Sequence, residues 1–204
     1  MCVFGTVHCG ATGSDVHGGA PSRPGVTQVD EAASKTGALA RKKSNEPILD
    51  GTRCAAFVPF LPAKLEGFRA KAPAEGSDID LGEGAALAIL RRGYWKPGIA
   101  LEVEIVDTER SKRLRDVFEQ TLKLERSNDT AVIKATTVQG HAAVAQWNST
   151  SRGNRVSILV GSRYLVNLNL RPANDASGAL EIAAKLDLAE LAKLQPSEQI
   201  AAQQ

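Results

Sequence analysis

The sequence lacks the features of a membrane-spanning or disulfide-stapled protein. No apolar run approaches the roughly 18 residues that a membrane helix needs, and the residues after Met1 lack the apolar centre of an export signal. The 204 residues include only 3 cysteines. Cys2, Cys9 and Cys54 all precede the segment in which a core is expected, which argues against a disulfide framework. We therefore expect free thiols and no transmembrane segment.

An excess of one charge is also missing, and this bears on the partners that the chain could bind. Lys and Arg total 25, Asp and Glu total 23, and the formal net charge is +2. The basic run from Arg41 to Lys43 is short, whereas nucleic-acid-binding domains usually carry a strong basic excess on one face. The composition therefore disfavours nucleic acid as a partner.

Motifs that hold cofactors or metals are not visible. The chain contains no phosphate-binding loop, no dinucleotide-binding glycine fingerprint and no G-x-S-x-G nucleophile turn. Cys2, His8, Cys9 and His17 are of the zinc-ligand types, but their spacing matches no familiar zinc finger. We therefore expect no cofactor and no metal site, and we name no catalytic residue.

Composition divides the chain into a tail, a domain and a short C-terminal end. Residues 1–56 are rich in Gly, Ser and Ala, and their few aliphatic residues show no period, which predicts a disordered tail. Apolar residues become dense at Phe57, and we expect a single domain over residues 57–195. The Gln-rich residues 196–204 are expected to fray.

Alternating and β-branched segments predict six strands in this domain. Residues 99–107 alternate between aliphatic and polar positions, as a half-buried strand does. They are expected to form a hairpin with residues 86–95 across a Lys-Pro-Gly turn. Residues 72–84 are predicted to be a loop because of their Pro, Gly, Ser and Asp content. The remaining strands are expected at residues 130–139, 141–148, 155–160 and 164–170.

Helical spacing of apolar residues predicts two helices. Leu114, Phe118 and Leu122 recur every four residues, which indicates a helix over about residues 111–124. A second helix is expected after the last strand, and Asp187 can cap a further turn. The expected order is β-β-α-β-β-β-β-α. This predicts an α+β fold, a mostly antiparallel sheet of about six strands with two helices packed on it.

The scarce large aromatic residues are the main candidates for a binding surface. Tyr164 follows Arg163 at a hairpin turn, and Trp95 and Trp147 lie toward the ends of predicted strands. Arg, Trp and Tyr are enriched at binding hot spots, although such aromatic residues more often belong to a core or its rim. With His141 at a strand start, these five residues are our candidate binding residues.

His141 is also the candidate for acid–base chemistry. A general base needs a partner within hydrogen-bond reach, such as Asp107 or a neighbouring carboxylate. Asp107, Glu109 and Asp116 crowd a strand end and a helix start, where carboxylates also favour the positive end of the helix dipole. The sequence leaves both interpretations of His141 open, a histidine at the rim of the sheet and a general base.

Several short motifs between Phe60 and Leu194 resemble a group of small, uncharacterised bacterial α/β proteins that are often exported. The strand order is similar to that of the Mog1/PsbP-like fold group. The resemblance implies a location in the periplasm or cell envelope and no catalytic residues. The matching pieces are Phe60-Leu61-Pro62, Gly67-Phe68, Ile105-Val106-Asp107, Gly140-His141-Ala142-Ala143, residues 160–166 and Leu186-Asp187.

These observations favour a non-catalytic binding or protein-interaction domain of the bacterial cell envelope. Its partner would be an unknown protein or small ligand. The alternative is a small enzyme that uses His141 with a nearby carboxylate. The compartment itself is unknown, because the export signal expected from the resemblance is not visible in the sequence.

Overall fold

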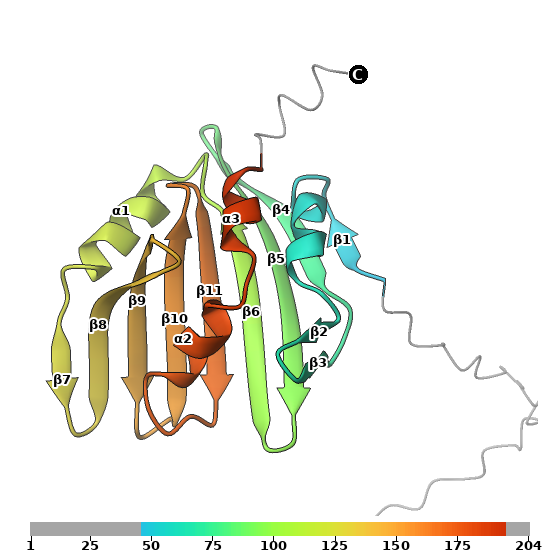
Figure 1. Cartoon of the computed structure of the whole chain (residues 1–204). Coiled ribbons are helices and arrows are strands. Elements are labelled where there is room, and N and C mark those ends of the chain that lie inside the picture. Colours follow the sequence, from blue (N-terminus) through green and yellow to red (C-terminus); the bar gives the residue numbers. More distant parts are fainter. Residues whose placement is uncertain (1–45, 195–204) are drawn as a thin grey trace, which may run out of the picture. The chain divides into compact units, whose positions relative to one another are not determined.

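One large sheet organises the protein (Figure 1). The computed structural model describes residues 46–194. It is mostly β, with an 11-stranded mixed sheet and only about 19% helix. The expected sheet of about six strands carrying two helices is therefore wrong. Residues 1–45 of the expected tail, with Cys2, His8, Cys9 and His17, lie outside the described residues, as do residues 196–204, the end that was expected to fray.

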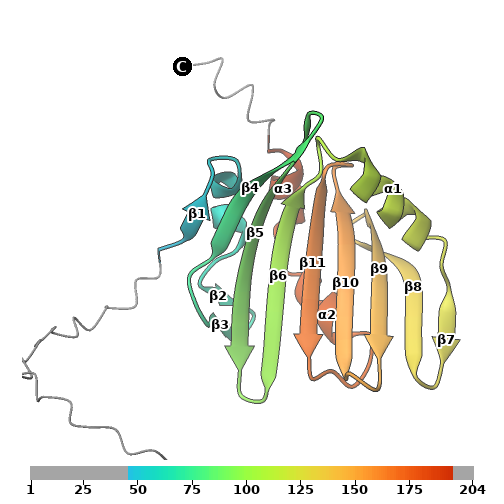
Figure 2. The same ribbon diagram turned by 180° about the vertical axis from the view of Figure 1, so that it is seen from behind.

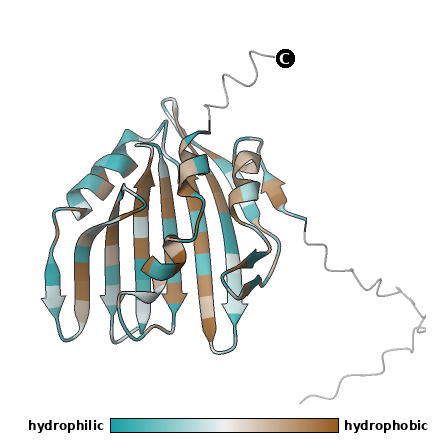
Figure 3. Cartoon of the chain, in the orientation of Figure 1, coloured by the Kyte–Doolittle hydropathy of each residue, from teal (hydrophilic) through white to brown (hydrophobic). Residues whose placement is uncertain are grey.

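The centre of the sheet consists of the strands that the alternation predicted. Each of these strands runs antiparallel to its neighbours, and aliphatic side chains alternate with polar ones along them (Figure 3). In sheet order they are β5 (Ala85–Lys96), β6 (Ile99–Asp107), β11 (Tyr164–Arg171), β10 (Gly153–Val160), β9 (His141–Asn148) and β8 (Ala131–Val138).

Five further strands were not expected, and they lie toward the edges. β4 (Glu75–Gly82) pairs with β5 inside the segment predicted to be a loop. Its Gly, Ser and Asp residues have low strand propensity, but pairing with a neighbouring strand overrides that preference. The others are β1 (Ile48–Asp50), which runs parallel to β4, β2 (Lys64–Leu65), β3 (Phe68–Ala70) and β7 (Arg126–Asn128).

Three short helical segments lie against one face of the sheet, which we call the first face (Figure 1). They are the 3-10 helix η1 (Cys54–Phe60), α2 (Gly178–Ala183) and α3 (Leu188–Ala192). Leu90, Val103 and Leu168 point to this face and are completely buried in the main core. Asp187 caps α3 as predicted, because its Oδ1 atom accepts a hydrogen bond from the backbone N–H of Glu190 at 3.1 Å.

The opposite face, which we call the second face, carries the residues that alternate with the core positions. Figure 2 shows its strands in view, with α1 (Lys112–Thr121) at one upper corner. Phe118 of α1 is buried, as are Val106 and Val144 of the second face, yet all three lie outside the main core cluster. Some apolar positions of the second face are therefore also buried, and its other positions are mostly polar.

The described residues before residue 57 include β1 and the start of η1. Cys54 is completely buried, and burial together with the nearby Asp78 carboxylate raises the pKa of its thiol. Asp78 holds the start of η1, accepting hydrogen bonds from the backbone N–H groups of Arg53 at 2.9 Å and Cys54 at 3.0 Å. Gly51 approaches Asp78 so closely that a Cβ atom there would lie 2.4 Å from the carboxylate carbon.

We expect Asp78→Ala to lower the free energy of unfolding by about 1–2 kcal/mol, because two backbone donors would lose their acceptor. Urea denaturation of the purified protein measures this change. Glu119→Ala, an exposed change on α1, serves as the control and should stay within about 0.5 kcal/mol of wild type. Equal effects of the two changes would contradict the capping role of Asp78.

Candidate functional site

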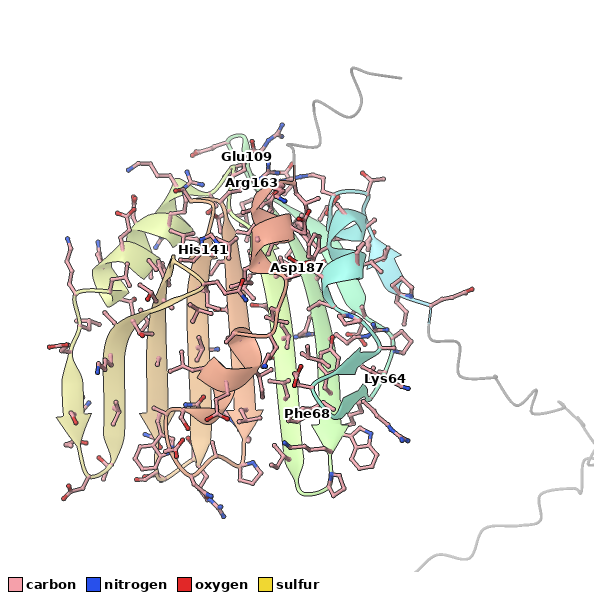
Figure 4. All side chains as sticks on the ribbon, viewed as in Figure 1. Lys64, Phe68, Glu109, His141, Arg163 and Asp187 are labelled. Carbon is pink, nitrogen blue, oxygen red and sulfur yellow. The ribbon has the colours of Figure 1, made fainter. Side chains whose placement is uncertain are left out.

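Arg163, the first candidate binding residue, is held in an ion pair at one end of the sheet (Figure 4). Its Nε and Nη2 atoms donate to the two carboxylate oxygens of Asp107 at 3.0 and 2.7 Å. Arg53 donates to the same carboxylate at 3.2 Å, and the backbone N–H of Glu109 does so at 2.9 Å. The group joins the start of η1, the end of β6 and the β10–β11 turn.

The Asp107 carboxylate is stabilised in its charged form. Its side chain is only 2% exposed. Burial alone would raise its pKa, but the hydrogen bonds from Arg163 and Glu109 and the two guanidinium charges outweigh burial and lower the pKa. Glu109 also pairs with Arg163 at 2.9 Å from a more exposed position. Arg163 is therefore committed to partners within the protein.

Tyr164 is a core residue that fastens the C-terminal segment. It is 2% exposed, and its ring meets the ring of Phe57 edge-on with a centroid distance of 5.7 Å. Its hydroxyl donates to the backbone oxygen of Leu194 at 3.0 Å. Burial raises the pKa of Tyr164 to about 12, so the hydroxyl remains a neutral donor at physiological pH.

The structure separates His141 from Asp107. β9 and β6 are three positions apart in the sheet, with β10 and β11 between them. Neighbouring strands lie about 4.8 Å apart, so the two backbones are about 14 Å apart, which is beyond the hydrogen-bond reach that proton transfer needs. Figure 4 shows His141 near the β8–β9 turn, away from Arg163 and Glu109.

The two tryptophans lie on opposite faces of the sheet. The strand registers place Trp95 with Ala100 on the second face, where it is 49% exposed. Trp147 pairs with the buried Asn154 on the first face, and its Nε1 atom donates to the backbone oxygen of Ala173 at 3.5 Å. The five candidate residues are thus distributed over both faces and several strands, and the structure does not bring them together.

A row of hydrogen-bonded polar side chains on the second face was missed by the sequence reasoning. The Asn167 amide donates to Glu104 at 3.0 Å and accepts from the Ser157 hydroxyl at 2.8 Å, which links β6, β11 and β10. In the next row, Arg155 donates to Asn169 at 2.9 Å. The signal was present in the sequence, since polar residues occupy the positions between the aliphatic ones of these strands.

A hollow of about 370 Å³ lies at the end of this face formed by β7 to β11. Three arginines line it, Arg126, Arg155 and Arg171, together with amide and hydroxyl side chains that include Gln146 and Ser151. No Asp or Glu is part of its lining. This distinguishes it from hollows of about 290 and 460 Å³ near β4, which contain side chains of both charges.

Among residues 46–194, no group of three or more His, Cys, Asp or Glu side chains is placed to hold a metal ion. None of the helices in the same range is both long and apolar enough to cross a membrane. Comparisons of the chain with family models, with curated proteins and with solved structures found no match.

We expect Asp107→Asn to lower the free energy of unfolding at pH 7 by about 3 kcal/mol or more, since Arg163 and Arg53 would lose the buried carboxylate that they share. Because folding lowers the pKa of Asp107, its stabilisation is present above an unfolded-state pKa of about 3.9 and is lost as the pH falls through the folded-state value. Wild-type stability should therefore fall in acid, and the variant should lose this part of the pH dependence.

Glu109→Gln is the matched control for this prediction. It removes a carboxylate that pairs with the same Arg163 but is 39% exposed, so the expected loss is about 0–1 kcal/mol. Urea titrations at several pH values give both quantities. Equal small losses for the two variants would show that the Asp107 pair does not stabilise the fold.

Proposed function

We propose that this domain is a non-catalytic binding module whose binding surface is the second face of the sheet. The observation that carries the proposal is the arrangement of polar groups on that face. Carboxylate, amide, hydroxyl and guanidinium groups from neighbouring strands stand in cross-strand rows, and no described helix other than α1 lies over them (Figure 2). A structural role alone would need only the buried first face.

The separation of the reactive side chains supports a binding role over an enzymatic one. His141 and Asp107 belong to strands that are three positions apart. Asp107 is already bonded to two guanidinium groups and a backbone N–H, so it has little capacity to accept a further proton at neutral pH.

The chemistry of the second face favours a polar ligand. Between β6 and β9, Glu102, Asn169, Arg155 and Gln146 follow one another in a single cross-strand row. Such a row offers both donors and acceptors at the regular strand spacing. The exposed large apolar side chains lie outside this row, on β1, β4, α1 and the chain after α1, and at Trp95 near the end of β5.

We further propose that the module acts in the bacterial cell envelope. This part of the proposal rests only on the motifs shared with small exported bacterial proteins. The strand pattern carries no information about the compartment.

A double variant on the second face tests the binding role. We expect small polar compounds that raise the melting temperature of the wild-type protein to lose that effect with Glu102→Ala/Gln146→Ala, because bound ligand stabilises the folded state by mass action. Lys185→Ala is the control, since Lys185 is exposed in the segment between α2 and α3 on the first face. The assignment of the binding surface to the second face would be refuted if the double variant kept the same ligand-induced rise in melting temperature, or if Lys185→Ala lost it.

Fractionation of the native host tests the location. We expect the protein in the periplasmic or envelope fraction, and N-terminal sequencing of the recovered protein shows where the mature chain begins. A protein found only in the cytoplasm with Met1 intact would contradict the envelope location. The binding role would then still be tested by the second-face variants.

A further inference from the structure

The hollow between β7 and β11 is the most distinctive polar feature of the second face. Its three arginines come from three different strands, Arg126 from β7, Arg155 from β10 and Arg171 from β11. Arg155, Gln146, Ile133 and Arg126 occupy one cross-strand row. The two arginine backbones in that row are about 14 Å apart at the usual strand spacing, and their long side chains border the space between them.

These guanidinium groups have no carboxylate partners. Among residues 46–194, none of Arg126, Arg155 and Arg171 forms a salt bridge, whereas Arg53 and Arg163 both pair with Asp107. The hollow therefore collects three positive charges without a carboxylate counterion from residues 46–194. Clustered like charges of this kind attract an anion and favour its approach.

Local structure directs two of the arginines to this hollow. Gly153 lies directly beside Arg171, since a Cβ atom on Gly153 would be 3.3 Å from the Nε atom of Arg171 and 3.1 Å from the hydroxyl of Ser151. The φ angle of Gly153 is not positive, so backbone conformation does not demand a glycine there. Arg155 is oriented by its Nε bond to the Asn169 oxygen, so that its two terminal nitrogens can serve other acceptors.

We propose that this hollow binds the phosphate group of a small phosphorylated molecule, an inference that rests on the proposed binding role of the second face. Guanidinium groups match phosphate oxygens in paired hydrogen bonds. A phosphate monoester carries about 1.5 to 2 negative charges at pH 7, which suits three cations better than one carboxylate does. The volume of about 370 Å³ falls within the range of small-ligand sites.

Titration of the full chain with inorganic phosphate and with phenyl phosphate, at constant ionic strength, tests the proposal. The readouts are the NMR signals of the Nε–H groups of Arg155 and Arg171, two of the arginines that line the hollow. We expect saturable shifts with both probes. Acetate should bind at least about tenfold more weakly than phosphate, because it carries a single charge.

Four variants separate a specific site from general charge attraction. Arg155→Gln and Arg171→Gln should each weaken phosphate binding about tenfold or more. Arg113→Gln makes the same charge change at an exposed position on α1 and should alter the dissociation constant less than twofold. Gly153→Ala should displace Arg171 and weaken binding without any change of charge, and its melting temperature without ligand shows whether the fold is intact.

Shifts that do not saturate, or equal weakening by Arg113→Gln, would overturn the phosphate site. If phosphate fails to bind while other ligands still depend on Glu102 and Gln146, only this inference is wrong and the binding role of the second face stands. If no ligand depends on either group of residues, both proposals are wrong.

Discussion

The two faces of the sheet impose different requirements on the same strands. Successive side chains of a strand point to opposite faces, so every strand that supplies a core residue also places its next residue on the other side. The segments η1, α2 and α3 bury the first face, where Leu90, Val103 and Leu168 are completely enclosed. Nothing of comparable extent covers the second face among the described residues, and its polar rows follow from that difference (Figure 2).

The ion pairs of Asp107 show that residues which the sequence suggested for binding have a structural role. Arg163 and Tyr164 are of the residue types that dominate binding surfaces, yet one is bonded to a buried carboxylate and the other lies in the core. Together with Arg53 they fasten the start of η1 and the C-terminal segment to the end of the sheet. Arg126, Arg155 and Arg171, which form no salt bridge among residues 46–194, lie instead at the hollow on the second face that we propose as an anion site.

The sequence predicted the local elements better than the sheet or the site. Alternating aliphatic and polar residues predict strands such as residues 99–107. In contrast, β4 contains Gly76, Ser77 and Asp78, which favour turns, and it forms a strand because β5 pairs with it. Asp107 and Arg163 are 56 residues apart, so their pairing was not visible either. The arginines of the hollow become neighbours only through the order β11-β10-β9-β8-β7, which local patterns do not determine.

Carboxyl labelling of the full-length native protein tests most directly whether the second face is open. A water-soluble carbodiimide couples a small amine to accessible carboxylates, and mass spectrometry locates the modified residues. Our account predicts rapid labelling of Glu102, which is exposed on the second face, and protection of Asp107, whose side chain is 2% exposed, until urea unfolds the protein. Protection of Glu102 as strong as that of Asp107 would show that the second face is covered and would contradict its role as a binding surface.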